Sequence, residues 1–285
     1  MPHAKGEAMS DKICPFNQTG RILLSTDGSE YSAGAVREAI NLASRCGSEL
    51  LALSVVETNV EFSALAPELV EKEELRTREH LDAVAAQAGE AGVSCETIAH
   101  EGDTPWRFVV DEADQRDVGL IVMGRRGRSA MQKIVIGSVT ARVIGHTSRP
   151  VLVAPRVANI TGGNVVLATD GSEYSHEAAK YAIDYGKNCG VVPIVVSVAG
   201  DGSELGRAEE NIRQVAEMAG QLDVEVEGVA VVGKPHEEIV RVAMDRSAEL
   251  IVIGSHGRTG LERLLMGSVA ERVIDNTVCA VLVIR

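Results

Sequence analysis

The sequence is poor in aromatic residues, in basic charge and in long apolar runs. Phe, Trp and Tyr make up 3% of its 285 residues, and 41 acidic residues outnumber 28 basic ones, which leaves a formal net charge of −13. A protein that binds nucleic acid or an anionic membrane needs a basic surface, so neither is expected as a partner. No apolar run reaches the roughly 18 residues of a membrane helix, and residues 1–19 lack the apolar region of a signal peptide. We therefore expect a cytoplasmic protein.

Cysteine is also scarce, and its spacing suggests no framework. The cysteines are odd in number, scattered and without a C-x-x-C pair. We interpret them as buried or incidental thiols of a reducing compartment, in preference to a redox or metal role. They are Cys14, Cys46, Cys95, Cys189 and Cys279.

What the chain does contain is a repeated pattern. Gly124–Ser138 reads GRRGRSAMQKIVIGS and Gly254–Ser268 reads GSHGRTGLERLLMGS, so each copy has Gly, two residues, Gly, nine residues and Gly-Ser. The segment DGSEYS also occurs twice, from Asp27 and from Asp170, at an offset of 143 residues (170 − 27), whereas the loops are offset by 130 (254 − 124). The second copy is thus 13 residues shorter (143 − 130), and the loss falls between its second and third strands. Fixed offsets with one local deletion indicate an internal duplication.

Each copy alternates short apolar runs with amphipathic segments. Five strands and four helices in each repeat predict an α/β fold with an open parallel sheet and helices on both faces. The length suits two domains. We expect a flexible leader over residues 1–19, a first domain over 20–155, a linker over 156–163 and a second domain over 164–285.

The two repeated motifs are expected to meet at one edge of each sheet. In open parallel sheets, ligands lie off the carboxyl ends of the strands, where the strand order reverses. Asp27, after the first strand, would then face Gly124–Gly127 after the fourth, and Asp170 would face Gly254–Gly257. Glycine N–H groups and a helix that starts at Gly-Ser suit a phosphate, while a carboxylate suits a ribose hydroxyl or a base N–H. The alternative is that both aspartates only cap helices.

On these motifs the chain resembles a tandem universal stress protein of the nucleotide-binding subgroup. The loop Gly-2x-Gly-9x-Gly-[Ser/Thr] after strand four and the aspartate after strand one are both present twice, and the resemblance covers roughly residues 20 to 285. It implies two Rossmann-like domains of strand order 3-2-1-4-5. It also implies that the last strands pair antiparallel, so that the two domains form a pseudo-dimer that imitates the family's homodimer. The implied ligand is an adenine nucleotide, either ATP or ADP or AMP, with or without Mg²⁺.

Carried over position by position, the resemblance implies one set of nucleotide-binding residues in each domain. The aspartates would contact the adenosine end, and the glycine loops the phosphates and ribose. The backbone near Val55, Val56 and Val198 would contact the adenine. The first set is Thr26, Asp27, Val55, Val56, Met123, Gly124, Arg126, Gly127, Arg128, Gly137, Ser138, Val139 and Thr140. The second set is Thr169, Asp170, Val198, Ile253, Gly254, His256, Gly257, Arg258, Gly267, Ser268 and Val269.

The two loops differ in charge. The first loop has three arginines, Arg125, Arg126 and Arg128. At the same positions the second loop has Ser255, His256 and Arg258. Arginine offers phosphate a fixed charge and a donor fork, which a neutral histidine does not. The sequence therefore predicts tighter triphosphate binding in the first domain, unless these side chains point into solvent. Thr140 also carries a hydroxyl where the second copy has Ala270.

Three functions fit these features. The first is an ATP-binding regulatory protein of the stress response, acting as a homo-oligomer of tandem chains with an unknown protein partner. The second is a slow ATPase or AMP-generating hydrolase, and the third a structural stress protein with vestigial loops. The sequence has no Walker A motif, no H-E-x-x-H and no Ser-His-Asp arrangement traceable from spacing. We therefore expect no catalytic residue and no metal site.

Overall fold

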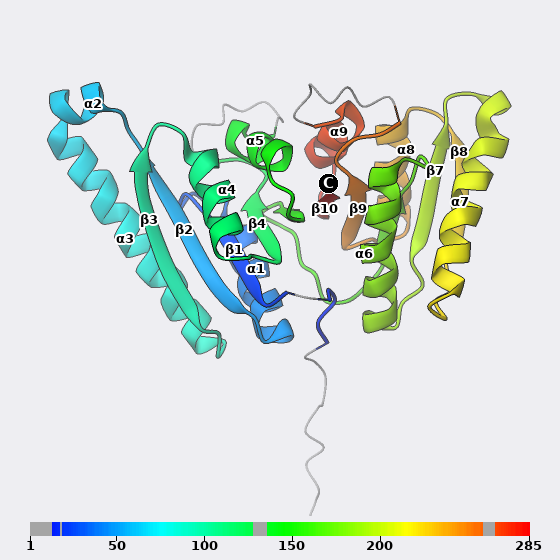
Figure 1. Ribbon diagram of the computed structural model, residues 1–285, viewed down its shortest axis with the longest axis horizontal. Coiled ribbons are helices and arrows are strands. Elements are labelled where there is room, and N and C mark those ends of the chain that lie inside the picture. The colour runs from blue at the N-terminus through cyan, green and yellow to red at the C-terminus, as the bar shows by residue number, and fades with distance from the viewer. Residues whose placement is uncertain (1–12, 18, 128–135, 259–265) are drawn as a thin grey trace, which may run out of the picture.

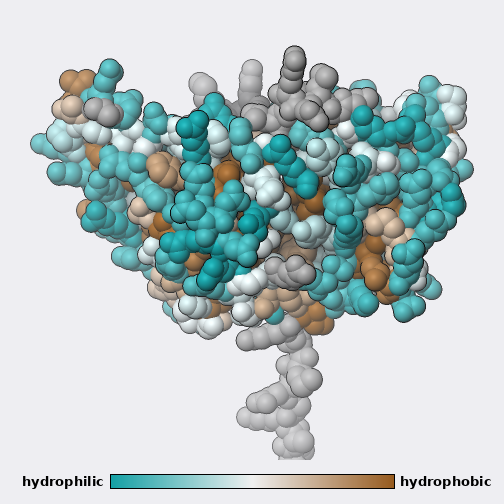
Figure 2. Space-filling model, in the orientation of Figure 1, coloured by the Kyte–Doolittle hydropathy of each residue, from teal (hydrophilic) through white to brown (hydrophobic). Residues whose placement is uncertain are grey.

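The described residues form a single ten-stranded sheet covered by helices on both faces (Figure 1). The computed structural model describes residues 13–17, 19–127, 136–258 and 266–285. Among the described helices, none is both long and apolar enough to cross a bilayer. Hydrophilic residues cover most of the face shown in Figure 2, with smaller apolar patches scattered among them.

The two halves of the chain contribute matching elements. The strands of the first half are β1 (Arg21–Ser25), β2 (Glu49–Glu57), β3 (Cys95–Gly102), β4 (Leu120–Gly124) and β5 (Val151–Ala154). Its helices are α1 (Ala33–Cys46), α2 (Val60–Leu65), α3 (Pro67–Glu90), α4 (Pro105–Gln115) and α5 (Ser138–His146). The strands of the second half are β6 (Val165–Ala168), β7 (Ile194–Ala199), β8 (Glu227–Val232), β9 (Leu250–Gly254) and β10 (Ala280–Ile284). Its helices are α6 (Glu173–Cys189), the short 3₁₀ helix η1 (Gly202–Glu204), α7 (Leu205–Gly220), α8 (Pro235–Asp245) and α9 (Ser268–Asn276).

The strand order is β3-β2-β1-β4-β5-β10-β9-β6-β7-β8. Pairing is parallel within each half, so the first half has the order 3-2-1-4-5 and the second half has the same order read from the other end. Among the described strands, only β5 and β10 pair antiparallel, with Leu152 opposite Leu282. The predicted fold class, strand order and pseudo-dimer are therefore confirmed. The pairing also removes two open sheet edges.

Two apolar layers run through both halves. Because successive strand residues point to opposite faces, Leu23 and Leu24 belong to different layers, as do Leu282 and Val283. One layer packs under α1, α3, α6 and α7, and the other under α4, α5, α8 and α9. The inner strands are buried on both sides, which explains their nearly continuous runs of Val, Ile and Leu, whereas the edge strands β3 and β8 are more exposed.

The connection between the halves is held by two glutamates. Glu38 in α1 is 0% exposed and accepts a hydrogen bond from Ile160 N at 3.0 Å, and burial raises its pKa. Glu249, just before β9, accepts from the N–H groups of residues 161–163 at 2.7 to 3.2 Å. The connection is therefore bound to both halves.

The N-terminal segment differs from the sequence expectation of a flexible leader that extends to residue 19. Phe16 is only 3% exposed and packs against Tyr185 of α6, with ring centroids 6.0 Å apart. A disulfide joins Cys14 to Cys46 at the end of α1, so the interpretation of every cysteine as a thiol is wrong for this pair. Scattered spacing could not reveal it, because only the folded chain brings residues separated by 32 positions together.

Candidate functional site

A cavity lies off the carboxyl ends of the strands in each half. In both halves the first strand separates the second from the fourth, so the strand order reverses beside it. The cavity is about 260 Å³ in the first half and about 640 Å³ in the second. Every predicted nucleotide-binding residue lines one of the two cavities, except Arg128, which lies outside the described residues.

The turn after the first strand is closed by its aspartate. Asp27 Oδ1 accepts hydrogen bonds from the backbone N–H of Ser29 at 3.0 Å and from its hydroxyl at 2.7 Å. Asp170 Oδ1 accepts from Ser172 N at 3.0 Å. The intervening glycine has φ of +72° in the first half and +74° in the second, a conformation that favours glycine. Both motifs therefore build the same tight turn.

Neither aspartate caps a helix, so that alternative is wrong. The N-cap of α1 is Ser32, and the N-cap of α6 is Ser172, whose side chain accepts from Ser175 N. Ser29 does not cap α1 either, because the chain makes another turn before Ala33. The aspartates are thus held at the strand ends by the turn itself.

The second carboxylate oxygen of each aspartate lies against the glycine loop. A Cβ atom on Gly127 would lie 2.7 Å from Asp27 Oδ2, and one on Gly257 would lie 2.6 Å from Asp170 Oδ2. Asp170 Oδ2 also accepts from Arg258 N at 2.8 Å. The predicted juxtaposition of aspartate and loop is therefore confirmed in both halves.

A helix begins at the same cavity. The helices α5 and α9 start at Ser138 and Ser268, after extended N-cap glycines that provide no side-chain cap. The first N–H groups of a helix have no intrahelical partner and carry its positive dipole end. This arrangement can bind an anion. Beside it, Val55 and Val56 at the end of β2, and Val198 in β7, form an apolar wall.

The comparisons with known proteins agree over nearly the whole chain. Residues 19–155 and residues 163–285 each match the Universal stress protein family. The chain belongs to the universal stress protein family. A universal stress protein of Methanocaldococcus jannaschii is 41% identical over 137 residues, which are 42% of this chain and 81% of the relative. One from Mycolicibacterium smegmatis is 27% identical and aligns with 93% of this chain and 96% of its own length.

A solved structure extends the likeness to the tandem architecture. The crystal structure of a universal stress protein from Archaeoglobus fulgidus has a TM-score of 0.76 and 26% sequence identity. The match covers 94% of this chain and 99% of that one. The arrangement of two halves in one chain is therefore shared with another family member.

Arg125 of the first loop does not line the cavity of this universal stress protein. Arg125 Nη1 donates to the carbonyls of Ile274, Asp275 and Thr277, at the end of α9, over 3.0 to 3.2 Å. Burial lowers the pKa of Arg125. The suggestion that its charge faces a phosphate is therefore wrong, because the side chain caps a helix of the other half. Arg126 does line the cavity, and its buried Nε has no hydrogen-bond partner among the described residues.

Sequence reasoning missed the side chains that α3 and α7 place beside the turn after the first strand of each half. His80 Nε2 lies 2.9 Å from Thr26 Oγ1, and its ring would lie 3.1 Å from a Cβ on Gly28. In the second half, Asn211 packs against the equivalent turn glycine and donates to Ser197 Oγ at 3.1 Å. The sequence did contain a signal for these side chains, because a spacing is repeated in the two halves. The pattern E-x-x-R-x-x-x-H from Glu73 corresponds to E-x-x-R-x-x-x-N from Glu204.

The two cavities differ in their lining. Glu57 and Thr77 line the first one, where the second half has Gly200 (200 − 57 = 143) and Ala208 (208 − 77 = 131). The larger side chains narrow the first cavity, and Glu57 adds negative charge. The hydroxyl of Thr140 donates to Gly124 O at 3.0 Å, so it bonds the protein itself. Within the described part of the chain, no three His, Cys, Asp or Glu side chains gather where a metal ion could bind.

Proposed function

We propose that this universal stress protein binds an adenine nucleotide, with ATP as the first candidate, and that occupancy regulates the stress response. The observation that carries the proposal is the aspartate carboxylate held against a glycine loop beside a helix N-terminus. The same constellation occurs in both halves. A carboxylate and a row of backbone N–H groups match the two ends of a nucleotide.

Each part of the second cavity would contact a different part of the ligand. Asp170 would accept from a ribose hydroxyl or a base N–H, and the wall at Val198 would pack against the base. Gly257, Gly267 and Ser268 would provide backbone donors for the phosphates. Mg²⁺, where present, would be held chiefly by the phosphates, because a nucleotide commonly supplies oxygen ligands to this ion.

We place the tighter site in the second half. The sequence favoured the first half because of its arginines, but Arg125 caps α9 and Arg128 lies outside the described residues. The second cavity has a volume of about 640 Å³ and the first a volume of about 260 Å³. Ligand cavities commonly span about 300 to 1,000 Å³. Glu57 at the first cavity, where the second half has Gly200, would also repel a polyphosphate.

Regulation is favoured over catalysis by the state of the two aspartates. Both are engaged in hydrogen bonds with the turn, and a general base must reach the proton that it abstracts. The alternatives are slow ATP hydrolysis and a structural protein with vestigial loops. We also propose that the tandem chains form a homo-oligomer, and that a protein partner binds according to whether the sites hold nucleotide.

The test combines mass spectrometry with calorimetry. Purified protein is denatured and the released small molecules are identified, and ATP, ADP, AMP and cAMP are then titrated into stripped protein. We expect Asp170→Asn to weaken binding by about 10- to 100-fold, the range for losing a hydrogen bond to a charged group, and Asp27→Asn to weaken it less. Circular dichroism checks that both variants fold.

The outcomes separate the three functions. Neither released nucleotide nor measurable binding would contradict the proposal and favour vestigial loops. Multiple turnover of ATP, abolished in both aspartate variants while binding persists, would favour the hydrolase. A larger loss of affinity in Asp27→Asn than in Asp170→Asn would show that the first half holds the tighter site.

A further inference from the structure

We propose that Cys14 and Cys46 are a redox-active pair whose disulfide fastens the N-terminal segment across the seam between the two halves, and whose reduction by a dithiol releases it. We call residues 13–17 and 19 the N-terminal clasp. The disulfide joins the clasp to the end of α1, and both cysteines are partly exposed. In Figure 1 the clasp is the dark-blue segment between the lower ends of α1 and α6.

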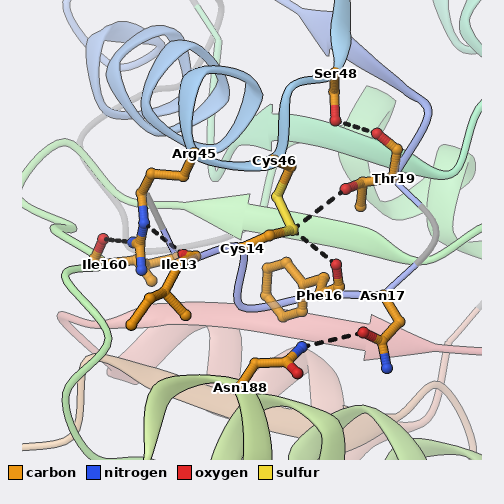
Figure 3. The surroundings of a disulfide bond; sticks show 10 residues. All are labelled: Ile13, Cys14, Phe16, Asn17, Thr19, Arg45, Cys46, Ser48, Ile160 and Asn188. Carbon is orange, nitrogen blue, oxygen red and sulfur yellow. Dashed lines mark hydrogen bonds between the residues drawn. A yellow bond between two sulfur atoms is a disulfide. The ribbon is translucent and has the colours of Figure 1, made fainter. Parts of the chain in front are cut away.

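The clasp is bound to the first half next to the disulfide. Arg45 Nε donates to Ile13 O at 3.0 Å, and Ser48 Oγ donates to Thr19 O (Figure 3). Arg45 also donates to Ile160 O at 2.9 Å, in the connection between the halves. One arginine thus holds the clasp and the connection together.

The same short segment reaches the second half. The ring of Phe16 packs against Tyr185 of α6, which is 0% exposed. One turn further along α6, Asn188 Nδ2 donates to Asn17 Oδ1 at 3.1 Å (Figure 3). The clasp therefore bridges the helix α1 of one half and the helix α6 of the other.

The non-covalent hold on the clasp is small without the disulfide. Pro15, Phe16 and Thr19 are buried, but Phe16 is the largest of them, and Ile13 is 51% exposed and Asn17 is exposed. Terminal segments with so few buried contacts open readily unless they are tied down. The covalent link therefore decides whether the clasp stays in place, and release uncovers the apolar surface around Tyr185.

The repeat provides an internal comparison. Cys189 has the position of Cys46 in the second half (189 − 46 = 143), but the position of Cys14 is taken by Val157 (157 − 14 = 143), which is 70% exposed. Cys189 is a free thiol, and burial raises its pKa. The duplication thus kept one cysteine in each half, and only the first half has a partner for it.

The chemistry is ordinary thiol–disulfide exchange. A thiolate of the dithiol attacks one sulfur of the pair, the S–S bond breaks, and a mixed disulfide forms with one cysteine. The second thiol of the reductant then releases that cysteine. Two electrons and two protons pass to the protein, and the dithiol becomes a disulfide. Oxidised glutathione, a small disulfide, reverses the reaction by accepting them.

The experiment measures hydrogen exchange in the full-length protein before and after reduction with dithiothreitol. We expect amide exchange in the clasp to become about tenfold faster on reduction and to recover with oxidised glutathione. The Tm should fall by about 5 °C. Cys14→Ser and Cys46→Ser should exchange fast under both conditions, whereas Cys189→Ser should keep the response.

Two results would overturn the proposal. One is the absence of a Cys14–Cys46 peptide from a non-reducing digest of the oxidised protein. The other is a confirmed disulfide whose reduction leaves exchange of the clasp unchanged. Because the wild-type chain is itself measured in both redox states, the test stands even where a serine variant fails to fold.

Discussion

Gly127 and Gly257 lie at positions that require glycine, because a carboxylate occupies the space where a side chain would be. Neither has a positive φ, so the backbone would accept other residues at both positions. The restriction comes from Asp27 and Asp170, whose Oδ2 atoms approach the glycine Cα to within the reach of a methyl group. The repeated glycine and the repeated aspartate are therefore parts of one constellation.

Gly257→Ala tests that constellation without removing a charge. The new methyl group must displace Asp170 Oδ2, which breaks its hydrogen bond from Arg258 N. We expect nucleotide affinity to fall by about tenfold, in line with the loss of a hydrogen bond to a charged group. Calorimetry measures the affinity, and Gly202→Ala, whose Cβ would meet nothing within 4 Å, is the control. Equal affinity in both variants would contradict the constellation.

The position of α1 depends on a close backbone contact that the sequence pattern of the helix does not predict. A Cβ on Gly34 would lie 2.1 Å from Pro155 O and 2.9 Å from the Cα of Arg156, just after β5. The glycine therefore lets the helix lie directly on the chain that leaves the sheet. The apolar periodicity of α1 predicts a helix, but not this close backbone approach.

Gly34→Ala should destabilise the protein although alanine is the better helix former. The clash is with backbone and no rotamer relieves it, so we expect a loss of about 1 to 3 kcal/mol. Gly89→Ala in α3, where a Cβ meets nothing within 4 Å, should instead be neutral or gain up to about 1 kcal/mol. Urea unfolding compares the two. A Gly34→Ala protein as stable as Gly89→Ala would show that α1 can shift freely.

The two halves are joined by more than the pairing of β5 with β10. Arg125 caps the end of α9, and Arg285 donates to Gly145 O near the end of α5. Gly145 and Asp275 are equivalent positions (275 − 145 = 130), so the same helix end is bound in both halves by arginines from different places in the repeat. The two halves therefore have equivalent contacts at these helix ends, although the arginines that make them do not occupy equivalent positions in the sequence.

Glu249 makes the joint between the halves sensitive to acid. Burial would raise its pKa, but hydrogen bonds from Thr161, Gly162 and Gly163 lower it on balance from the ordinary value of 4.5. A carboxyl group with a lowered folded pKa contributes stability that is complete above its unfolded pKa and is lost as pH falls through the folded one. Glu38 acts in the opposite sense, because burial raises its pKa.

Glu249→Gln should therefore be less stable than wild type at about pH 7 and should lose less of its stability between about pH 5 and pH 3. Urea unfolding at each pH gives the free energies of unfolding. Glu209→Gln, exposed on α7, is the matched control and should follow the wild type. If Glu249→Gln keeps the full acid loss, other carboxyl groups must account for it.

Several features follow from the sequence by itself. The duplication, the apolar runs of strands such as β4 and β9, and the pairing of Asp27 and Asp170 with their glycine loops were all predicted and are found. They could be predicted because each rests on local spacing, or on a rule of parallel sheets that brings carboxyl ends of neighbouring strands together. The resemblance to the family added the strand order.

Only the tertiary structure decided the direction of Arg125, the contact of His80 with Thr26, the entry of Asn211 into the second cavity, the unequal cavities and the Cys14–Cys46 disulfide. Each depends on segments far apart in the chain, and their packing has no periodicity to reveal it. A side chain takes the partner that the fold brings within reach, as when an arginine of one half meets the free carbonyls of a helix in the other.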